Sequence, residues 1–339
     1  MLVLSGDIGG TRTRMQLTEF TASNVMKAIA VVRYNNSDHS SFIDIINNFF
    51  MEAKIKPSEI VSACFGVAGP VANGKVNLTN LPWIIDTNDI KHALKVDKVE
   101  LINDFMAIGY GISVLKPEDL LTLQVGKSHE DGIKAYIGAG TGLGVGFMTC
   151  RQGTCLLHST EGGHVDFAPT DDTQLDLLKY LRKKYHRVSF ERVLSGMGLV
   201  NIYYFVRDNK IFGEEENLEL CSLIKSGSNV DVAAVVAEYA IKHKDIMAIR
   251  ALDIFMRIYG AAVGNLALTT LPFGGLYVVG GIAPKLLTQI KKGSFLEAFA
   301  DKGRMSALLK GIPLHIVLYE DIGLQGAAVC ARKIGLLPI

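Results

Sequence analysis

The stretch LVLSGDIGGTRTRMQ, from Leu2 to Gln16, determines how we interpret the rest of the chain. An apolar start, an acid at Asp7, the turn Gly9-Gly10-Thr11 and then alternating residues predict two strands joined by a tight glycine turn. Such a turn exposes several N–H groups and a hydroxyl on one side, which suits anionic oxygens. Because Asp7 would repel a phosphate unless a cation lay between them, the stretch suggests a hairpin for phosphate and Mg²⁺. The alternative is an ordinary hairpin with a surface acid.

Length and charge set the broad class of the protein. The chain has 339 residues, which favours two domains over one core. Its 35 basic and 34 acidic residues give a net charge of +1, so bulk charge recruits neither nucleic acid nor an anionic membrane. Five cysteines without a C-x-x-C pair argue against a zinc site or a disulfide framework. The cysteine pattern, together with a start that lacks the basic segment of a signal peptide, indicates a reducing, cytoplasmic compartment.

One uncharged segment needs a separate interpretation. Ile258–Pro284 carries no charge over 27 residues, which is long enough for a membrane helix. Pro272 and the pairs Gly274-Gly275 and Gly280-Gly281 interrupt it. We therefore predict a buried helix, a turn, a buried strand over Leu276–Val279 and a glycine loop, with no membrane span.

The strand–glycine–strand pattern occurs twice. A strand at 135–137, a glycine turn at Gly138–Gly142 and a strand at 143–148 repeat the first hairpin. The repeat predicts two similar α/β domains, over 1–113 plus about 319–339 and over 114–318, each with a phosphate hairpin. Periodicity and end signals predict further strands at 25–34, 60–67, 96–102 and 312–318, and helices at 40–54, 87–94 (capped by Thr87 or Asn88), from Phe105, and at 173–185, 189–207, 217–225, 231–269 (more than one), 285–300 and 324–334.

Four polar or glycine motifs are candidate binding residues. Asn103-Asp104 follows a buried strand, where ligands bind in open α/β sheets, although Asp104 could simply cap the next helix. Glu161 and His164 flank two glycines in a loop suited to vicinal hydroxyls, or His164 could bond its own loop. Glu191 could join them or serve as a first-turn helix acid. Gly280-Gly281 would let a flat ring approach the backbone, or form a tight strand-to-helix turn.

Together these motifs resemble the bacterial-type glucokinases, in the superfamily of sugar kinases, actin and heat-shock ATPases. The resemblance covers nearly the whole chain, and its blocks are GDIGGT (6–11), INDF (102–105), GAGTGLG (138–144), EGGHVDF (161–167), ERVLSG (191–196), GNLAL (264–268) and GGI (280–282). EGGHVDF and ERVLSG are the specific blocks. The resemblance implies a two-lobed α/β, ribonuclease H-like fold of the actin/hexokinase ATPase type, with the active site in the cleft between the lobes.

The resemblance also implies an activity and residue roles. The expected reaction is transfer of phosphoryl from ATP to glucose with Mg²⁺, in a homodimer. Asp104 is implied as the catalytic base, and the implied sugar ligands are Asn103, Asp104, Glu161, His164 and Glu191. The implied ATP ligands are Asp7, Gly9, Gly10, Thr11, Gly140, Thr141, Gly280 and Gly281, with Asp7 at the metal. Arg12 stands where the family often has Asn, which leaves the contacts of that position open. A kinase of another hexose or amino sugar and a silent sugar-sensing regulator are the alternatives.

Overall fold

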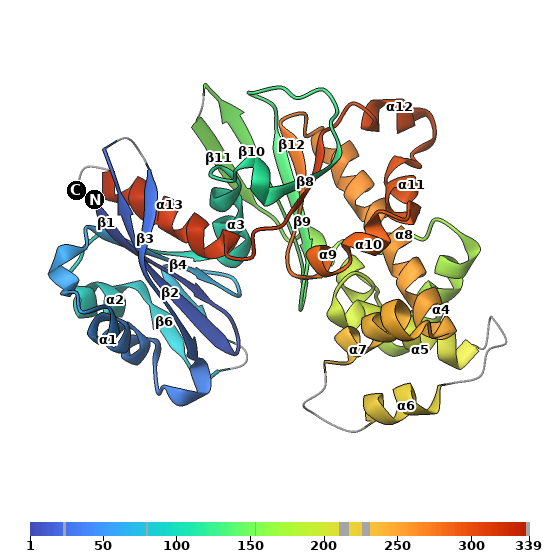
Figure 1. Ribbon diagram of the computed structural model, residues 1–339, viewed down its shortest axis with the longest axis horizontal. Coiled ribbons are helices and arrows are strands. Elements are labelled where there is room, and N and C mark those ends of the chain that lie inside the picture. Colours follow the sequence, from blue (N-terminus) through green and yellow to red (C-terminus); the bar gives the residue numbers. More distant parts are fainter. Residues whose placement is uncertain (23–24, 79–80, 153, 210–216, 226–230, 337–339) are drawn as a thin grey trace. The chain divides into compact units, whose positions relative to one another are not determined.

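The structure is a computed structural model that describes residues 1–339 except 23–24, 79–80, 153, 210–216, 226–230 and 337–339. The chain divides into two compact units (Figure 1). One unit contains Met1–Pro117, Leu157–Ser159 and Asp321–Ile339, and the other contains Glu118–Leu156 and Thr160–Glu320. The domain borders expected from the sequence, at 113 and about 319, stay a prediction. The last residues of the predicted first domain, 337–339, lie outside the described part of the chain.

The first unit is built on a five-stranded sheet in the order β3-β2-β1-β4-β7. β2 is antiparallel to β1 and β3, whereas β4 is parallel to β1 and β7. Helices cover both faces, since one core cluster joins the sheet to α1 and α2 and another joins it to α3 and α13. The elements are β1 (Leu2–Ile8), β2 (Arg12–Phe20), β3 (Met26–Asn35), α1 (Phe42–Ala53), β4 (Ser62–Val67), the small pair β5 (Lys75–Asn77) and β6 (Ile84–Asp86), α2 (Thr87–Leu94), β7 (Val99–Asn103), α3 (Asp104–Ile112) and α13 (Ile322–Leu336).

The second unit repeats this topology. Its sheet has the order β11-β10-β9-β12-β13-β8, in which the first five strands follow the order of the first sheet. The predicted duplication of an α/β unit is therefore confirmed. The strands of its sheet are β8 (Leu120–Gln124), β9 (Lys134–Ala139), β10 (Leu143–Arg151), β11 (Thr154–Ser159), β12 (Gly275–Val279) and β13 (Leu314–Val317). Of these residues, Leu157–Ser159 at the end of β11 are grouped with the first unit. Its helices are α4 (Asp172–Tyr185), α5 (Gly196–Asn209), α6 (Leu218–Lys225), α7 (Val232–Glu238), the π-turn η6 (Tyr239–His243), α8 (Ile246–Thr270), α9 (Ile282–Lys285), α10 (Leu287–Ile290), α11 (Ser294–Ala300) and α12 (Ser306–Leu309).

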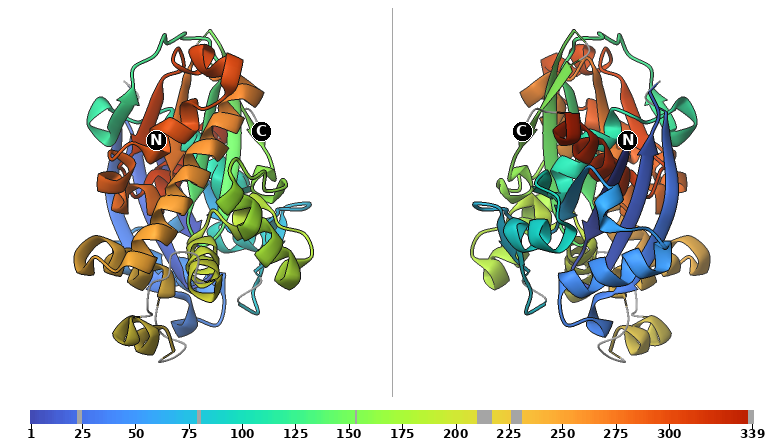
Figure 2. Two further views of the ribbon diagram at one scale, coloured as in Figure 1. Left: turned by 90° about the vertical axis from the view of Figure 1, so that its right-hand side faces the viewer. Right: turned by 90° about the vertical axis from the view of Figure 1, so that its left-hand side faces the viewer.

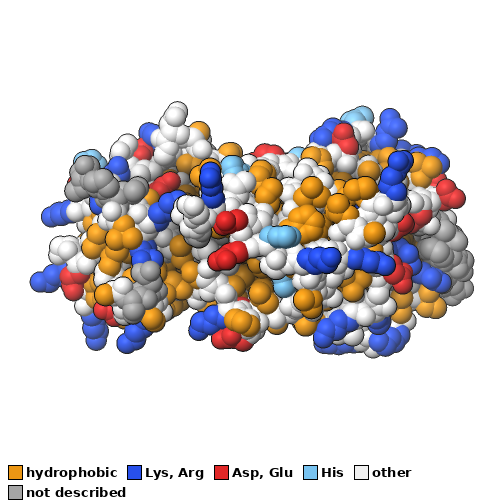
Figure 3. Space-filling view, turned by 90° about the horizontal axis from the view of Figure 1, so that it is seen from above, with side chains coloured by type: hydrophobic (Ala, Val, Ile, Leu, Met, Phe, Trp, Pro, Cys, Tyr) orange, Lys and Arg blue, Asp and Glu red, His pale blue; other side chains and the backbone are white. Residues whose placement is uncertain are grey.

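The uncharged segment folds as predicted. α8 ends at Thr270, and β12 spans Gly275–Val279 with every residue buried. Figure 2 (left) shows α8, in orange, among the helices of this unit. Within the described ranges, no helix is long and apolar enough to cross a membrane. The face seen in Figure 3 mixes acidic, basic and hydrophobic side chains, as the near-zero net charge predicts.

Several predicted boundaries are wrong. The single helix expected at 189–207 is a 3₁₀ turn, η5 (Phe190–Arg192), followed by α5 from Gly196. The cap of α2 is Asp86, whose side chain accepts from the N–H of Asn88, while the Thr87 hydroxyl donates to the Gly74 carbonyl. The helix expected at 285–300 is two short helices, α10 and α11, which follow the end of α9. β8 and β11 carry no clear alternation and are not predicted.

One cysteine prediction is also wrong. Cys150 and Cys155 form a disulfide with an S–S distance of 2.03 Å. They lie on the neighbouring strands β10 and β11, whose hairpin brings their Cα atoms to 4.1 Å. A search for C-x-x-C spacing cannot detect such a cross-strand pair. Cys64, Cys221 and Cys330 are buried free thiols.

Candidate functional site

The glycine turn between β1 and β2 is closed by its own backbone. The N–H of Gly9 donates to the carbonyl of Arg12 at 3.0 Å, so Arg12 contributes backbone to the turn while its side chain is exposed. Asn36, which was not predicted from the sequence, is 1% exposed and stabilises the turn by two hydrogen bonds. Its amide donates to the Gly9 carbonyl at 2.8 Å and its N–H donates to the Thr11 carbonyl at 2.9 Å. The turn therefore presents Gly10 and Thr11 on a fixed base.

Asp7 belongs to a charged network that the sequence analysis did not predict. The register of β1 and β2 places Asp7 directly opposite Arg14, and the two side chains form an ion pair. The Arg14 guanidinium also bonds Asp321, 307 residues further along the chain. Asp321 lies between β13 and α13, directly before the helix, whereas Asp104 directly follows β7 and is the first residue of α3. Only its place between a strand and a helix could have identified it.

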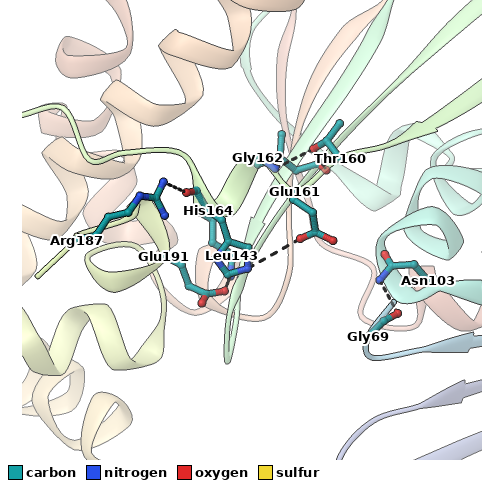
Figure 4. A network of polar contacts seen from close by, with 10 residues as sticks. Gly69, Asn103, Leu143, Thr160, Glu161, Gly162, His164, Arg187 and Glu191 are labelled. Carbon is teal, nitrogen blue, oxygen red and sulfur yellow. Dashed lines mark hydrogen bonds and ion pairs between the residues drawn. The ribbon is translucent and has the colours of Figure 1, made fainter. Parts of the chain in front are cut away.

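Asn103 and Asp104 lie at the C-terminal end of β7, as predicted. Asn103 is the N-cap of α3, because its side-chain oxygen accepts from the N–H of Phe105 at 2.9 Å. Its amide donates to the Gly69 carbonyl at 3.2 Å (Figure 4). Asp104 is the first helical residue and accepts from the same N–H at 2.9 Å, so the capping alternative holds for Asn103 and only in part for Asp104.

The environment of Asp104 changes its acidity. Burial raises the pKa of this carboxyl from its usual value near 3.8 to about 6, and the negative charge of Asp7 adds to the effect. A carboxyl with that pKa is ionised at pH 7 yet basic enough to take a proton. Because the charge of Asp7 affects the pKa of Asp104, the two carboxyl groups lie in the same region of the first unit.

The residues around Asp7 suit Mg²⁺ bound together with phosphates. Carboxylate oxygens are the ligands that this ion prefers, and it is usually held by one or two of them plus substrate phosphates and water. Among the described residues, no three His, Cys, Asp or Glu side chains form a group that could hold a metal ion by themselves. Asp7 and the neighbouring turn therefore fit a nucleotide-borne Mg²⁺ better than a permanent metal centre.

The second glycine loop joins the end of β9 to β10. The N–H of Gly140 donates to the Gly142 carbonyl at 2.9 Å, and the Gly140 carbonyl accepts from Gly196 at 2.8 Å. Gly280 has a φ of +85°, and a Cβ built on it would lie 2.8 Å from the Ala139 carbonyl oxygen. The structure thus brings Gly280-Gly281 beside Gly140-Thr141. Nothing lies within 4 Å of a Cβ built on Gly140 or Gly281, so both face open space.

The two glycines between Glu161 and His164 are required by packing. A Cβ built on Gly163 would lie only 1.9 Å from the Leu143 carbonyl oxygen, and one on Gly162 would lie 2.9 Å from Cβ of Val145. The loop therefore lies directly on the start of β10. Glu161 and His164 project from it with side-chain exposures of 81% and 56% and point toward one another, Oε2 to Nε2 at 3.9 Å (Figure 4).

A second segment fixes this loop. Phe167 donates to the Val188 carbonyl at 3.0 Å and Phe190 donates to the Val165 carbonyl at 2.9 Å. Arg187, which the sequence analysis does not predict, donates to the His164 carbonyl at 2.7 Å and forms an ion pair with Asp166 at 2.8 Å. This segment continues into η5, and residues 193–195 then separate η5 from α5.

Glu191 contacts the glycine loop before β10 and lies close to the Glu161–His164 loop. Its Oε2 accepts from the N–H of Leu143 at 3.0 Å (Figure 4), and the carbonyl oxygen of Leu143 faces Gly163. Glu161, His164 and Glu191 therefore all lie around the start of β10. One carboxylate oxygen of Glu191 is occupied by backbone, which is a structural role beyond the predicted one.

The predicted site residues form two groups, one in each unit. Asp7, Gly9, Gly10, Thr11, Asn103 and Asp104 belong to the first, and Gly140, Thr141, Glu161, His164, Glu191, Gly280 and Gly281 to the second. That the two groups face one cleft stays a prediction.

Comparisons with known proteins identify the family. A family model described as Glucokinase matches residues 4–334. The chain is 43% identical to a protein of Nostoc sp. named glucokinase over 98% of this chain and 99% of that one, and 34% identical to one of Shigella sonnei over 97% of both. It superposes on the crystal structure of a glucokinase from an Antarctic psychrotroph with a TM-score of 0.83 and 30% identity, covering 98% of this chain and 99% of that one. A ROK family glucokinase from Streptomyces griseus, in complex with glucose and AMPPNP, matches at a TM-score of 0.63 and 20% identity over 98% of this chain and 100% of that one, which shows the fold alone. The chain belongs to the glucokinase family, and its α/β fold is the one shared by these structures.

Proposed function

We propose that the protein transfers the γ-phosphoryl group of ATP to the 6-hydroxyl of D-glucose, giving glucose 6-phosphate and ADP. Curated relatives at 41–43% identity over nearly the full chain carry the name glucokinase, which supports the substrate. The observation that carries the proposal for this chain is the partly buried carboxyl of Asp104. It lies at the C-terminal end of a parallel strand and has a pKa near 6.

Asp104 is the proposed base. In a loose transition state the attacking oxygen gains bond order late, so the base first orients the hydroxyl and accepts its proton afterwards. The sugar proton passes to a carboxylate oxygen of Asp104 as the phosphoryl group reaches the 6-oxygen. Asn103, fixed by Phe105 and Gly69, holds a neighbouring hydroxyl.

Glu161, His164 and the second oxygen of Glu191 are the proposed partners of the remaining hydroxyls. Two carboxylates and an imidazole can bond alcohols in specific directions. Because Glu191 also holds the N–H of Leu143, it links sugar binding to the glycine loop at Gly140-Thr141.

The two glycine turns are the proposed nucleotide contacts. Gly9, Gly10, Thr11, Gly140 and Thr141 offer N–H groups and hydroxyls to phosphate oxygens. Gly280-Gly281 lies beside Gly140-Thr141, and the open space at Gly281 is proposed for adenosine. Asp7, oriented by Arg14, would hold Mg²⁺, which neutralises phosphate charge when bound.

A coupled assay over a panel of hexoses and phosphoryl donors tests the proposal, with glucose and ATP expected to give the highest kcat/KM. Asp104→Asn keeps the shape and can still bond the hydroxyl but cannot take its proton. We expect it to bind glucose within about tenfold of the parent and to lose at least about 10²-fold in kcat. Turnover within about tenfold of the parent would show that Asp104 is only a helix-start residue.

We further propose a cytoplasmic homodimer. Light scattering of the purified protein tests the oligomeric state. A reducing cytoplasm would keep Cys150 and Cys155 mostly as thiols, which trapping with a thiol reagent in intact cells can measure.

A further inference from the structure

A cavity of about 460 Å³ lies within the second unit and contains none of the predicted site residues. Its walls come from η6 and the following turn, the N-terminal half of α8, and α10 and α11. Figure 1 shows α8, α10 and α11 next to one another. A cavity of this size is large enough for a small metabolite.

The cavity has an apolar floor and a charged rim. Ala240, Leu252 and Met256 are at most 4% exposed and form the floor. Six of the twelve lining residues are charged, whereas 20% of the chain is. They are Lys244, Arg250, Arg257 and Lys292, with Asp253 and Glu297.

The charged lining residues comprise four cations and two carboxylates. Arg257 bonds Asp253 at 3.1 Å, and the charges of Glu297 and, from outside the lining, Asp171 also act on Arg257. The Lys244 ammonium donates to the Ile241 carbonyl. Because cations outnumber carboxylates among the lining residues, the cavity favours an anionic ligand such as a phosphate monoester. The two carboxylates would repel a bare anion, but they accept hydrogen bonds from hydroxyl groups, as Gln289 and Ser294 also can.

We propose that this cavity binds a sugar phosphate. The phosphate lies among the Lys and Arg side chains, the hydroxyls face Asp253 and Glu297, and the apolar face of the ring covers Leu252 and Met256. The product of the proposed reaction, glucose 6-phosphate, belongs to this chemical class, so the proposal extends the proposed function by a second site for the product.

The cavity is physically connected to the nucleotide loop. Phe295 follows the lining residue Ser294 and makes an edge contact with Tyr259, their ring centroids 5.5 Å apart. The Tyr259 oxygen accepts from the N–H of Ala139 at 3.4 Å, one residue before Gly140. Only one short helix, α9, lies between Gly280-Gly281 and α10 in the chain. Ligand contacts with α11 are therefore expected to reach the loop that takes ATP phosphates.

Calorimetric titration tests the site. Glucose 6-phosphate is titrated into protein saturated with glucose and AMPPNP, which fill the catalytic site. We expect one binding event, weakened at least about tenfold by Lys292→Glu. Lys291→Glu, at an exposed neighbouring lysine outside the lining, is the matched control and should bind within about twofold of the parent. Neither lysine belongs to the proposed catalytic machinery, so failure here leaves the kinase proposal intact.

Three outcomes would overturn the proposal: no binding of glucose 6-phosphate to the saturated protein, equal weakening by both substitutions, or inorganic phosphate binding as tightly as the sugar phosphate. For the connection, we expect glucose 6-phosphate at saturating glucose to change the KM for MgATP about fivefold in the parent but not in Lys292→Glu. An equal change in both proteins would mean that the product acts at the catalytic site instead.

Discussion

The acidity of Asp104 follows from its burial at the start of α3. An aspartate in water is ionised above pH 4, whereas burial and the nearby charge of Asp7 hold the pKa of Asp104 at about 6. The folded protein therefore binds this proton more tightly than the unfolded chain does. The proposed function and stability are opposed at this residue, because burial disfavours the ionised form that the proposed proton transfer to Asp104 requires.

Removing this charge should stabilise the protein at neutral pH. Folding stability falls as pH rises from about 4 to 6, because the folded state gives up its proton later than the unfolded state. Above pH 6 the buried charge costs about 3 kcal/mol. We expect Asp104→Asn to exceed the parent by up to about that amount in urea unfolding at pH 7.5, and to equal it near pH 4.

The matched control is Asp86→Asn at the cap of α2. A hydrogen bond from Lys75 lowers the pKa of Asp86, so its charge stabilises the fold above pH 4 and its loss should not raise stability at pH 7.5. A less stable Asp104→Asn at pH 7.5 would mean that bonding to Phe105 outweighs the cost of burial.

The side chains of Glu161 and His164 allow a second test at the scale of single residues, which concerns the proposed glucose site. Loss of a bonding partner in a bound complex costs about 1–3 kcal/mol, so Glu161→Gln and His164→Ala should each raise the KM for glucose about 10- to 100-fold. The KM for ATP should change little. Glu130→Gln, at an exposed acid of the same unit outside this loop, serves as control. An unaltered glucose KM in both variants would remove these residues from the sugar site.

At the scale of elements, short contacts between backbones place the candidate ligands. The Glu161–His164 loop reaches β10 only because residue 163 has no side chain. The break between η5 and α5 lets Glu191 face Leu143 instead of continuing a helix. The Ser195 hydroxyl stabilises the break by donating to the Glu191 carbonyl at 2.8 Å.

Gly163→Ala should therefore displace the loop. Its Cβ would overlap the Leu143 carbonyl oxygen, and overpacking of this kind typically costs about 1–3 kcal/mol. We expect lower stability in chemical unfolding together with a raised glucose KM. Gly281→Ala, where a Cβ meets open space and φ is −77°, should leave stability unchanged. Equal stability of the two variants would contradict the packing argument.

At the scale of the whole molecule, one topology is used twice. The glycine turns lie at equivalent places, between β1 and β2 in the first sheet and between β9 and β10 in the second. In each sheet the last parallel strand, β7 or β13, precedes a helix that begins near an aspartate, Asp104 or Asp321. Each unit also has core clusters of its own. Separate cores favour separate unfolding of the two units.

Calorimetry of paired core variants tests this independence. Leu4, in the first unit, and Leu276, in the second, are both fully buried. Replacing either by Ala should cost about 2–5 kcal/mol. We expect two thermal transitions, with Leu4→Ala lowering one midpoint and Leu276→Ala the other. A single transition lowered by both would show that the units unfold together.

The sequence by itself determined the features that depend on neighbouring residues. Alternation and glycine turns predicted both hairpins, the repeat predicted two α/β units, and interruptions in Ile258–Pro284 predicted a buried helix and strand. The same local signals marked Asn103-Asp104 and the Glu161–His164 loop as candidate ligands, while their roles came from the family resemblance. Each of these signals lies within a few residues of the feature it predicts.

Only the tertiary structure decided the features that join distant segments. Asp321 bonds Arg14 across 307 positions, and Arg187 bonds the carbonyl of His164, 23 residues before it. The pKa of Asp104 depends on what surrounds the carboxyl, which no local pattern contains. Such pairings and burial are set by strand register and packing of the whole unit, because their energy comes from contacts that exist only after the chain has folded.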